Sequence, residues 1–586
     1  MPGTATTLHS LMGIPAQEQT LHSAFALRVE TVRHWLDQLP RANTGATARA
    51  VHEAVVELNR VQLPPAQRLV LLDMIQPVQQ SLRDRMKRQH LARPGLSPIQ
   101  PARVTRVLET MTATLATGYA IAATAAAEPI AAARSDAAAQ ANSARLLCAR
   151  AVARALGEQF ENLLLYSRRY QAPPPNFWAT VHALHELATD APEQQLSPSE
   201  SPRAAYLQCL LLGASGTQQL HQRDLEALAR HLPGWAAMTE LVHGAPGHCV
   251  LIVNPAGDSG PLHRSKVKDV NLRWLGIDVN PLTRQLEALL EQTTTGPERA
   301  LLLHLRDMWT SARTRTFMRV ATRETLKLAL GLSGTHDCVT GSDDFEAFMA
   351  GEAASMLQRD RHSPFPPAPS VESEPRPRDV WDSVFDVGAR GMSDTLASVS
   401  EYIRDQRDVE DGNHRKPAPL EVHTVNASPR GYCIGWPEGH TPEPLAGEIV
   451  GVQRETDDGR WMVGTIRWVH QGTDGRLVGL ELLSANAVAY AAVALQRGRR
   501  QVPYRALMLP EMKVIGLAST LLTPQGQFRE AQNVVLIEHG RERRVRLTRQ
   551  VAATHAYSRF EFRVLETRPD NQTPAEDSLH ALWDLL

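Results

Sequence analysis

The sequence predicts a multidomain α+β protein with an all-helical N-terminal half followed mainly by small β-domains. The chain has 586 residues, which exceeds what a single hydrophobic core usually accommodates. Residues 1–243 carry apolar side chains at helical spacing, whereas most of residues 418–565 carry them in short alternating runs. Clusters of Gly, Pro and Asp separate these runs, as in antiparallel strands joined by tight turns.

The all-helical domain, residues 1–243, is predicted to contain helical hairpins in series, arranged as a bundle or an irregular solenoid. The expected helices span 21–39, 46–58, 66–88, 101–127, 131–170, 177–188, 202–213 and 221–232. One of them carries His182, His185 and Glu186 at a spacing that suits metal ligands. No second cluster completes a metal site, so we expect an ordinary role for them on the helix surface.

Residues 244–312 are predicted to form an α/β connector. The apolar strand 249–253 precedes a glycine-containing loop, 254–260, and helices at 280–292 and 298–311 follow. A strand followed by a glycine loop is typical of phosphate-binding loops. This loop lacks their Lys-Ser/Thr pair, so we interpret it as a turn.

An arginine pair precedes the next predicted strand, within a segment spanning residues 313–335. Arg315 and Arg319 form an Arg-x-x-x-Arg pattern ahead of the strand 325–330. Two guanidinium groups at this spacing can form bidentate hydrogen bonds with phosphates or with the edge of guanine. A solvated basic loop would have the same residues. Arg319 and Arg323 repeat the spacing, but we favour Arg315 and Arg319 because the strand should begin directly after the second arginine.

A small polar motif opens the β-rich segment 418–495. Asn426, Ser428 and Gly431 form an Asn-x-Ser-x-x-Gly pattern at a strand edge. The amide and the hydroxyl can both donate and accept hydrogen bonds, and thereby read the edge of a purine. The glycine allows a tight turn or close approach to a ligand. An ordinary polar turn fits the motif equally well.

Residues 336–417 are predicted to be a helical and Pro-rich insertion, with helices at 343–358 and 380–407 flanking the Pro/Ser/Glu-rich stretch 361–379. Residues 496–567 are predicted to form a second small β-domain, and residues 568–586 a tail with a short helix. The β-domain contains the arginine clusters 497–500 and 541–549. Acidic and apolar residues interleave with them, which favours a charged strand face over a nucleic-acid site.

Composition excludes several classes of protein. The formal net charge of −1 gives no overall attraction to nucleic acid or to a membrane surface. The five cysteines are scattered, so they indicate neither a disulfide framework nor a zinc site, and they fit a reducing cytosol. The N-terminus carries no signal-peptide pattern. We find no nucleophile, paired-carboxylate or metal constellation and therefore predict no catalysis, no metal and no cofactor.

Taken in order, the motifs resemble the PilZ domain, a family of bacterial receptors for cyclic diguanylate. The matching parts are Arg315 and Arg319 before a strand, then Asn426, Ser428 and Gly431, and then the strand segments 464–468 and 478–482. A long helical half before such a region is similar to FimW-type cyclic-di-GMP effectors of surface attachment. The chain departs from the family pattern by placing more than a hundred residues between Arg319 and Asn426.

The resemblance implies a six-stranded β-barrel in which Arg315 and Arg319 clamp phosphates and guanine faces, while Asn426, Ser428 and Gly431 contact guanine. It implies a cytoplasmic cyclic di-GMP effector that relays the signal to a protein partner through its helical half, with recruitment to a cell pole or a membrane-associated machine. We expect no nucleic-acid partner and no membrane insertion. The alternative is a scaffold whose degenerate barrel no longer binds nucleotide, and the long insertion favours it. The two readings differ in whether the two motifs meet in space.

Overall fold

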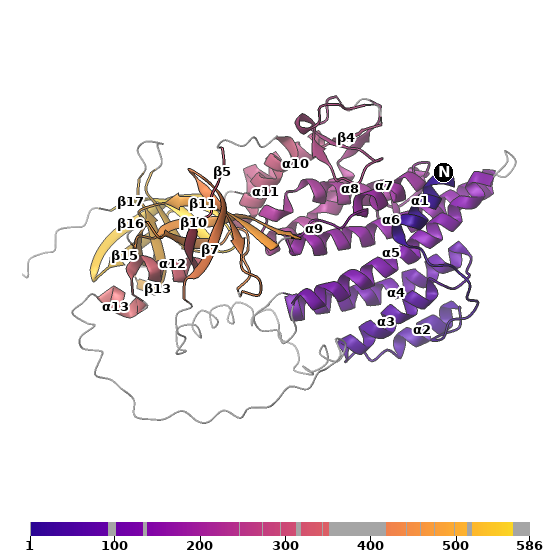
Figure 1. Cartoon of the computed structure of the whole chain (residues 1–586), viewed down its shortest axis with the longest axis horizontal. Helices are drawn as coiled ribbons and strands as arrows, with labels where there is room; N and C mark the ends of the chain where they lie inside the picture. The colour runs from indigo at the N-terminus through magenta and orange to yellow at the C-terminus, as the bar shows by residue number, and fades with distance from the viewer. Residues whose placement is uncertain are drawn as a thin grey trace, which may run out of the picture.

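The molecule is elongated, with helices at one end and two β-barrels at the other (Figure 1). It is known from a computed structural model. The residues that the structure describes are 2–91, 101–132, 138–244, 247–271, 273–293, 295–311, 318–342, 344–350, 418–440, 442–456, 459–473, 475–496, 499–511 and 518–565. The predicted α+β class, with a helical half followed by β-barrels, is confirmed.

The helical half is built around two long helices, α5 (Pro101–Ala132) and α6 (Ala138–Arg168), which pack against each other. Buried alanines on both helices allow this close approach. The other helices are α1 (Pro2–Met12), α2 (Val29–Asp37), α3 (Thr44–Leu58), α4 (Pro65–Met86), α7 (Phe177–Leu187), α8 (Pro202–Ala214) and α9 (Gln222–Ala237). Their apolar faces form one continuous core.

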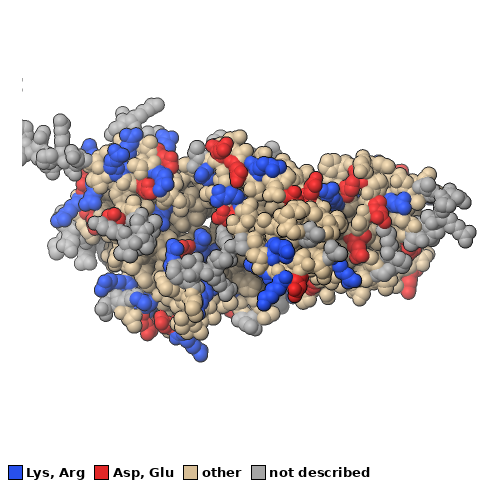
Figure 2. Space-filling model, turned by 90° about the horizontal axis from the view of Figure 1, so that it is seen from above, with Lys and Arg blue, Asp and Glu red and all other residues tan. Residues whose placement is uncertain are grey.

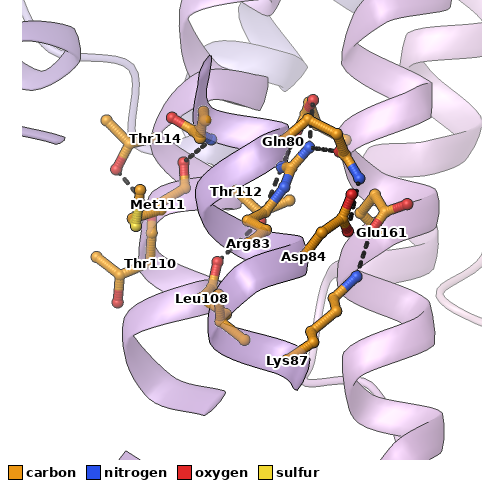
Figure 3. Close-up of polar contacts among 12 residues, drawn as sticks. Gln80, Arg83, Asp84, Lys87, Leu108, Thr110, Met111, Thr112, Thr114 and Glu161 are labelled. Atoms are coloured by element: carbon orange, nitrogen blue, oxygen red, sulfur yellow. Dashed lines mark hydrogen bonds and ion pairs between the residues drawn. The ribbon is translucent and has the colours of Figure 1, made fainter. Parts of the chain in front are cut away.

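A buried ionic network ties α4, α5 and α6 together (Figure 3). Arg83 of α4 pairs with Glu158 of α6, and the side chains are only 1% and 4% exposed. Arg83 also donates to Thr112 Oγ1 of α5 at 3.1 Å. One turn further along, Lys87 Nζ lies 2.9 Å from Glu161 Oε2. Burial raises the pKa of Glu158, and the charge of Arg83 opposes this rise.

The connector forms a four-stranded antiparallel sheet, with strand order β1-β4-β2-β3, and two helices. Its strands are β1 (Glu240–Val242), β2 (Leu251–Val253), β3 (Leu262–His263) and β4 (Leu275–Asp278), and its helices are α10 (Asn280–Gln292) and α11 (Gly296–Thr310). The glycine-containing loop is a turn that caps α7, because Asp258 accepts hydrogen bonds from the amides of Asn176 at 2.6 Å and Ala179 at 3.0 Å.

The same loop corrects the expectation for His182. This histidine is buried and lies 2.8 Å from the hydroxyl of Tyr206 and 3.0 Å from the carbonyl oxygen of Ser259. The expected role on the helix surface is therefore wrong for His182, because the loop covers its face of α7. Helical periodicity does not reveal such a covering loop.

The first barrel is a closed ring in the order β7-β6-β9-β10-β11-β8, with the short strand β5 added beside β7. The strands are β5 (Val320–Ala321), β6 (Thr325–Leu330), β7 (Leu420–Ser428), β8 (Gly431–Trp436), β9 (Ile449–Arg454), β10 (Met462–Gly472) and β11 (Gly475–Ser484). The predicted strand 325–330 is β6, which pairs with β7 and β9. Strands separated by the long insertion thus complete one barrel.

The second barrel closes in the order β12-β13-β14-β17-β16-β15. Its strands are β12 (Val488–Gln496), β13 (Arg499–Leu509), β14 (Thr520–Pro524), β15 (Asn533–Glu538), β16 (Arg541–Ala553) and β17 (Tyr557–Val564). β12 belongs to this barrel, although the sequence-based division assigned residues up to 495 to the first one. Only three residues separate β11 from β12, so the sequence contains no linker to mark the change.

Two short helices join the barrels. α12 (Gly331–Thr340) follows β6 directly and contacts strands of both barrels, and α13 (Phe345–Ala350) contacts β15. Arg505 of β13 holds Asp337 of α12 at 3.0 Å. Helical structure thus begins at Gly331, ahead of the insertion predicted from residue 336. The remainder of that insertion, the helix predicted at 380–407 and the tail 568–586 lie outside the described residues.

Tyr170, just beyond α6, attaches the helical half to the first barrel. Its ring is buried in the barrel core. Its hydroxyl donates to Leu220 O and accepts from Ala446 N, both at 3.1 Å, and its carbonyl accepts from Gln471 N at 2.9 Å. The half-buried Glu448 lies near this hydroxyl, and burial raises its pKa to about 7.

Breaking the buried ion pair should destabilise the helical half. Arg83→Met leaves the Glu158 carboxylate buried without its cation, and we expect the free energy of unfolding to fall by about 3–5 kcal/mol. The double variant Arg83→Met/Glu158→Leu should recover most of the loss, because apolar side chains then fill the same space. Urea unfolding followed by far-UV circular dichroism measures both. Equal losses in the single and double variants would contradict the assignment.

Glu448 should make stability depend on pH. The pKa of Glu448 is higher in the folded state than in the unfolded state, so its ionisation destabilises the folded protein. This loss of stability grows as the pH rises from about 4.5 to about 7 and is complete above that range. Glu448→Gln should therefore be stabilising at pH 8, by up to about 3 kcal/mol, and nearly neutral at pH 4.5. Differential scanning calorimetry at the two pH values tests this. A stability difference that does not change with pH would show that Glu448 is not held in an unfavourable site.

Candidate functional site

The candidate site lies on the outer face of the first barrel, and a β-bulge creates it. The partners of β7 on β8 shift by one residue between Thr424 and Asn426, which leaves Val425 as the extra residue. Before the bulge, Val422 belongs to the barrel core. After it, Asn426 pairs with Cys433 and Ser428 with Gly431, on the face opposite the core residue Ile434. Strict alternation would have aimed both polar side chains inward.

A second bulge turns an aromatic ring onto the same face. The partners of β10 on β11 shift between Ile466 and Trp468, with Arg467 as the extra residue. Ile466 is in the core, and Trp468 pairs with Gly479 on the outer face. A Cβ at Gly479 would lie 2.1 Å from the indole, so the ring rests directly on the glycine backbone. It forms a partly exposed flat surface beside the polar residues.

Small residues form the floor between these two features. Gly431 and Cys433 of β8 face outward beside Gly479 of β11. A Cβ at Gly431 would lie 1.9 Å from Leu480 O, so no larger residue fits there without moving a strand. Cys433 is buried, which raises the pKa of its thiol, and the charge of Arg319 opposes this rise. The floor is therefore shallow and closely packed.

The arginine motif meets the polar motif at this floor. Val320 and Ala321 of β5 pair with Ala427 and Asn426 of β7. Arg319 precedes this pairing and lies on the same outer face, with its Cζ 6.0 Å from the centre of the Trp468 ring. Arg319 is exposed, and β5 begins directly after it. Arg315 lies outside the described residues, so its position and the choice of arginine register stay predictions.

The remaining predicted residues are placed as follows. The Ser428 hydroxyl donates to Gly431 O at 3.2 Å, which closes the turn between β7 and β8. Within the described part of the chain, the side-chain amide of Asn426 has no hydrogen-bond partner. The predicted residues Arg319, Asn426, Ser428 and Gly431 thus share one face, and their roles in binding a ligand stay predictions.

Three further residues of this face have no role predicted from the sequence. Trp468 is the stacking surface, Arg430 lies inside the polar motif, and Glu481 of β11 lies 3.4 Å from Arg430 and 2.9 Å from Arg467. Arg430 and Arg467 are largely exposed. The role of Arg430 could have been predicted, because it is an arginine inside a turn that is expected to bind an anion. Trp468 had no such signal, because its side of the sheet depends on the bulge, and Glu481 had none, because its position beside Arg430 depends on the pairing of β11 with β8.

Positive charge is concentrated near this end of the molecule. In the view of Figure 2, Lys and Arg side chains are most frequent over the barrels, whereas Asp and Glu are scattered along the whole length. A local cluster can attract an anion even though the formal net charge is −1. The residues described here contain no cluster of metal-ligating side chains, and none of their helices is long and apolar enough to cross a membrane.

Comparison with known proteins identifies the architecture. Residues 30–246 match the family model of the N-terminal domain of the cyclic-di-GMP receptor FimW, residues 250–488 match its middle PilZ domain, and residues 490–565 match the FimW C-terminal beta-barrel domain. The chain belongs to the FimW family. The cyclic-di-GMP receptor FimW of Pseudomonas aeruginosa is 27% identical over 627 aligned positions, which cover 99% of each chain. No solved structure matches the chain.

Membership in the FimW family accounts for the three-part layout. The described strands from β5 to β11 fall within the residues matched by the middle PilZ domain, and the predicted resemblance to PilZ domains is confirmed. The second barrel corresponds to the C-terminal beta-barrel domain. The candidate site therefore lies on the PilZ barrel of a FimW-family protein.

Gly431→Ala should open the sheet beneath the site. The added methyl group would meet the carbonyl oxygen of Leu480, so we expect a loss of about 1–3 kcal/mol in the stability of this barrel. Gly435→Ala is the matched control in the same strand, because a Cβ there meets nothing within 4 Å. Thermal unfolding of the two variants gives the comparison. Equal melting temperatures would show that Gly431 is not needed for this packing.

Proposed function

We propose that this protein is a non-catalytic bacterial second-messenger effector that binds cyclic di-GMP on the outer face of its PilZ barrel and relays binding to a protein partner. The observation that carries the proposal is the meeting of Arg319 with Asn426 and Ser428 on one barrel face. More than a hundred residues separate these motifs in the sequence. The curated relative is named a cyclic-di-GMP receptor, which supports the same ligand.

The residues suit the ligand chemically. A guanine base stacks on the flat Trp468 ring and against the Arg319 guanidinium, which already lies over that ring. The Asn426 amide and the Ser428 hydroxyl are donors and acceptors for the edge of the base. Arg315, Arg319 and Arg430 supply charge-assisted hydrogen bonds to the two phosphates. Gly431 keeps the floor low enough for the ligand to approach the backbone.

The protein acts, in this proposal, in the cytoplasm, in surface attachment, pili or motility, and the helical half binds the protein partner. Recruitment to a cell pole or a membrane-associated machine follows from that partner. The alternative, a scaffold with a degenerate barrel, needs no convergence of the two motifs. The shared face of Arg319 and Asn426 is therefore an argument for ligand binding.

Isothermal titration calorimetry with cyclic di-GMP tests the proposal. Arg319→Ala should weaken binding about 10- to 100-fold, which corresponds to losing charge-assisted hydrogen bonds of about 1.5–3 kcal/mol. Combined with Arg315→Ala, it should abolish the heat. Trp468→Ala should weaken binding by removing the stacking surface.

Two control variants sharpen the titration. Arg323→Ala tests the arginine register, since a small effect favours the Arg315/Arg319 pair. Arg546→Ala removes an exposed arginine from β16 of the second barrel and should change nothing. Wild-type protein that gives no heat at about 50 μM cyclic di-GMP would overturn the proposal.

A further inference from the structure

Glu481 lies between the candidate site and the second barrel. On the outer face, one row of paired residues runs from Ser428 through Gly431 and Glu481 to Thr465. Ser428 and Gly431 belong to the candidate site. Thr465 is buried, and its side chain lies close to Tyr557 of β17. Glu481 is therefore the charged residue of this row that separates the ligand-binding end from the interface between the barrels.

The Glu481 carboxylate holds two arginines. Its Oε1 lies 3.4 Å from Arg430 Nη2, and its Oε2 lies 2.9 Å from Arg467 Nε. Glu481 is 28% exposed, whereas Arg430 is 61% and Arg467 54% exposed. One carboxylate thus binds the arginine of the Asn-x-Ser-x-x-Gly turn and the arginine of the β10 bulge.

The second barrel faces the same carboxylate. Burial lowers the pKa of the Arg559 guanidinium in β17, and the negative charges of Glu481 and Glu561 oppose this change. Thr465, Arg467 and Tyr557 also line a cleft of about 320 Å³ between the two barrels and helices α9 and α11. The negative charge of Glu481 therefore acts on both sides of the barrel interface.

We infer that Glu481 competes with the ligand inside the protein: its carboxylate pairs with Arg430, which binds a phosphate of the ligand instead once the site is occupied. The inference rests on the proposed function. A phosphate at the candidate site attracts Arg430, whose guanidinium is exposed and pairs with the Glu481 carboxylate. Glu481 then loses one of its two arginine partners. Its carboxylate is left to interact with Arg467 and, across the barrel interface, with Arg559. Occupancy of the site in this way changes the contact between the barrels.

The strength of the effect follows from the exposure of the groups. Ion pairs between exposed side chains are weak, so a phosphate can exchange with the carboxylate readily. Removing the carboxylate charge should free Arg430 and also remove repulsion between Glu481 and the phosphate. We therefore expect Glu481→Gln to bind cyclic di-GMP about three- to tenfold more tightly than the wild type.

Titration calorimetry of Glu481→Gln against the wild type tests the competition. Glu443→Gln is the matched control: it removes one negative charge from the same barrel, at a residue that pairs with Arg476. Its affinity should equal that of the wild type. Wild-type binding with unchanged or weaker affinity in Glu481→Gln overturns the inference and leaves the proposed function standing. Absence of wild-type binding overturns the proposed function itself.

Hydrogen exchange on the full-length protein tests the coupling. Saturating cyclic di-GMP should change the exchange of amides in β17 of the wild type and leave them unchanged in Glu481→Gln. If Glu481→Gln proves insoluble, Glu481→Asp provides the same test, because its shorter carboxylate reaches the arginines less well and should also tighten binding. Unchanged β17 exchange in the saturated wild type contradicts the coupling.

Discussion

The register shift at Val425 is the constraint on which the candidate site depends. In a closed barrel each strand is fixed by two neighbours, so an extra residue in β7 must be accommodated on both of its edges. On one edge the pairing with β8 shifts, and on the other edge residues 322–324 separate β5 from β6, so that each of these strands pairs with its own part of β7. Thr424 stabilises this arrangement, since its hydroxyl accepts from the amide of Glu324 at 2.8 Å and from the hydroxyl of Thr322 at 3.0 Å. The bulge thus turns Asn426 outward and allows β5 to present Arg319 beside it.

The barrel tolerates the long insertion because the closing strands are fixed by their own burial. Leu326 and Leu328 of β6 are fully buried in the barrel core, and β6 pairs with β9 as well as with β7. The entropy of closing a loop rises only slowly with its length, by about 0.6 kcal/mol for each doubling. A long connection between β6 and β7 therefore weakens the barrel little. Distance along the sequence is a poor argument that the two halves of the motif do not meet.

The sequence predicted those parts of the structure that depend on local periodicity. It predicted β6 at 325–330 and the helical half, because alternation and helical spacing are visible in one segment at a time. It also predicted the polar motif and the arginine motif as candidates. It did not predict that Trp468 lies on the outer face, because this depends on the β10 bulge, or that Glu481 lies beside Arg430, because this depends on the pairing of β11 with β8. The helix α12 and the membership of β12 in the second barrel were missed for the same reason: tertiary contacts decide them.

The ionic contacts of the molecule fall into two groups. Buried pairs are costly to open, whereas more exposed pairs can exchange partners. A ligand shifts a conformational equilibrium only by its difference in binding free energy between two arrangements. The Arg83–Glu158 pair is buried among three helices, and opening it would leave a charge without solvent or partner. Contacts at the site and the domain junctions are more exposed, including Arg430 with Glu481 and the His555–Asp224 pair between the second barrel and α9. An anion bound as proposed would need to open only these more exposed contacts, which costs little free energy. In the proposed function, the junctions between domains are therefore the part of this fold that the ligand would rearrange.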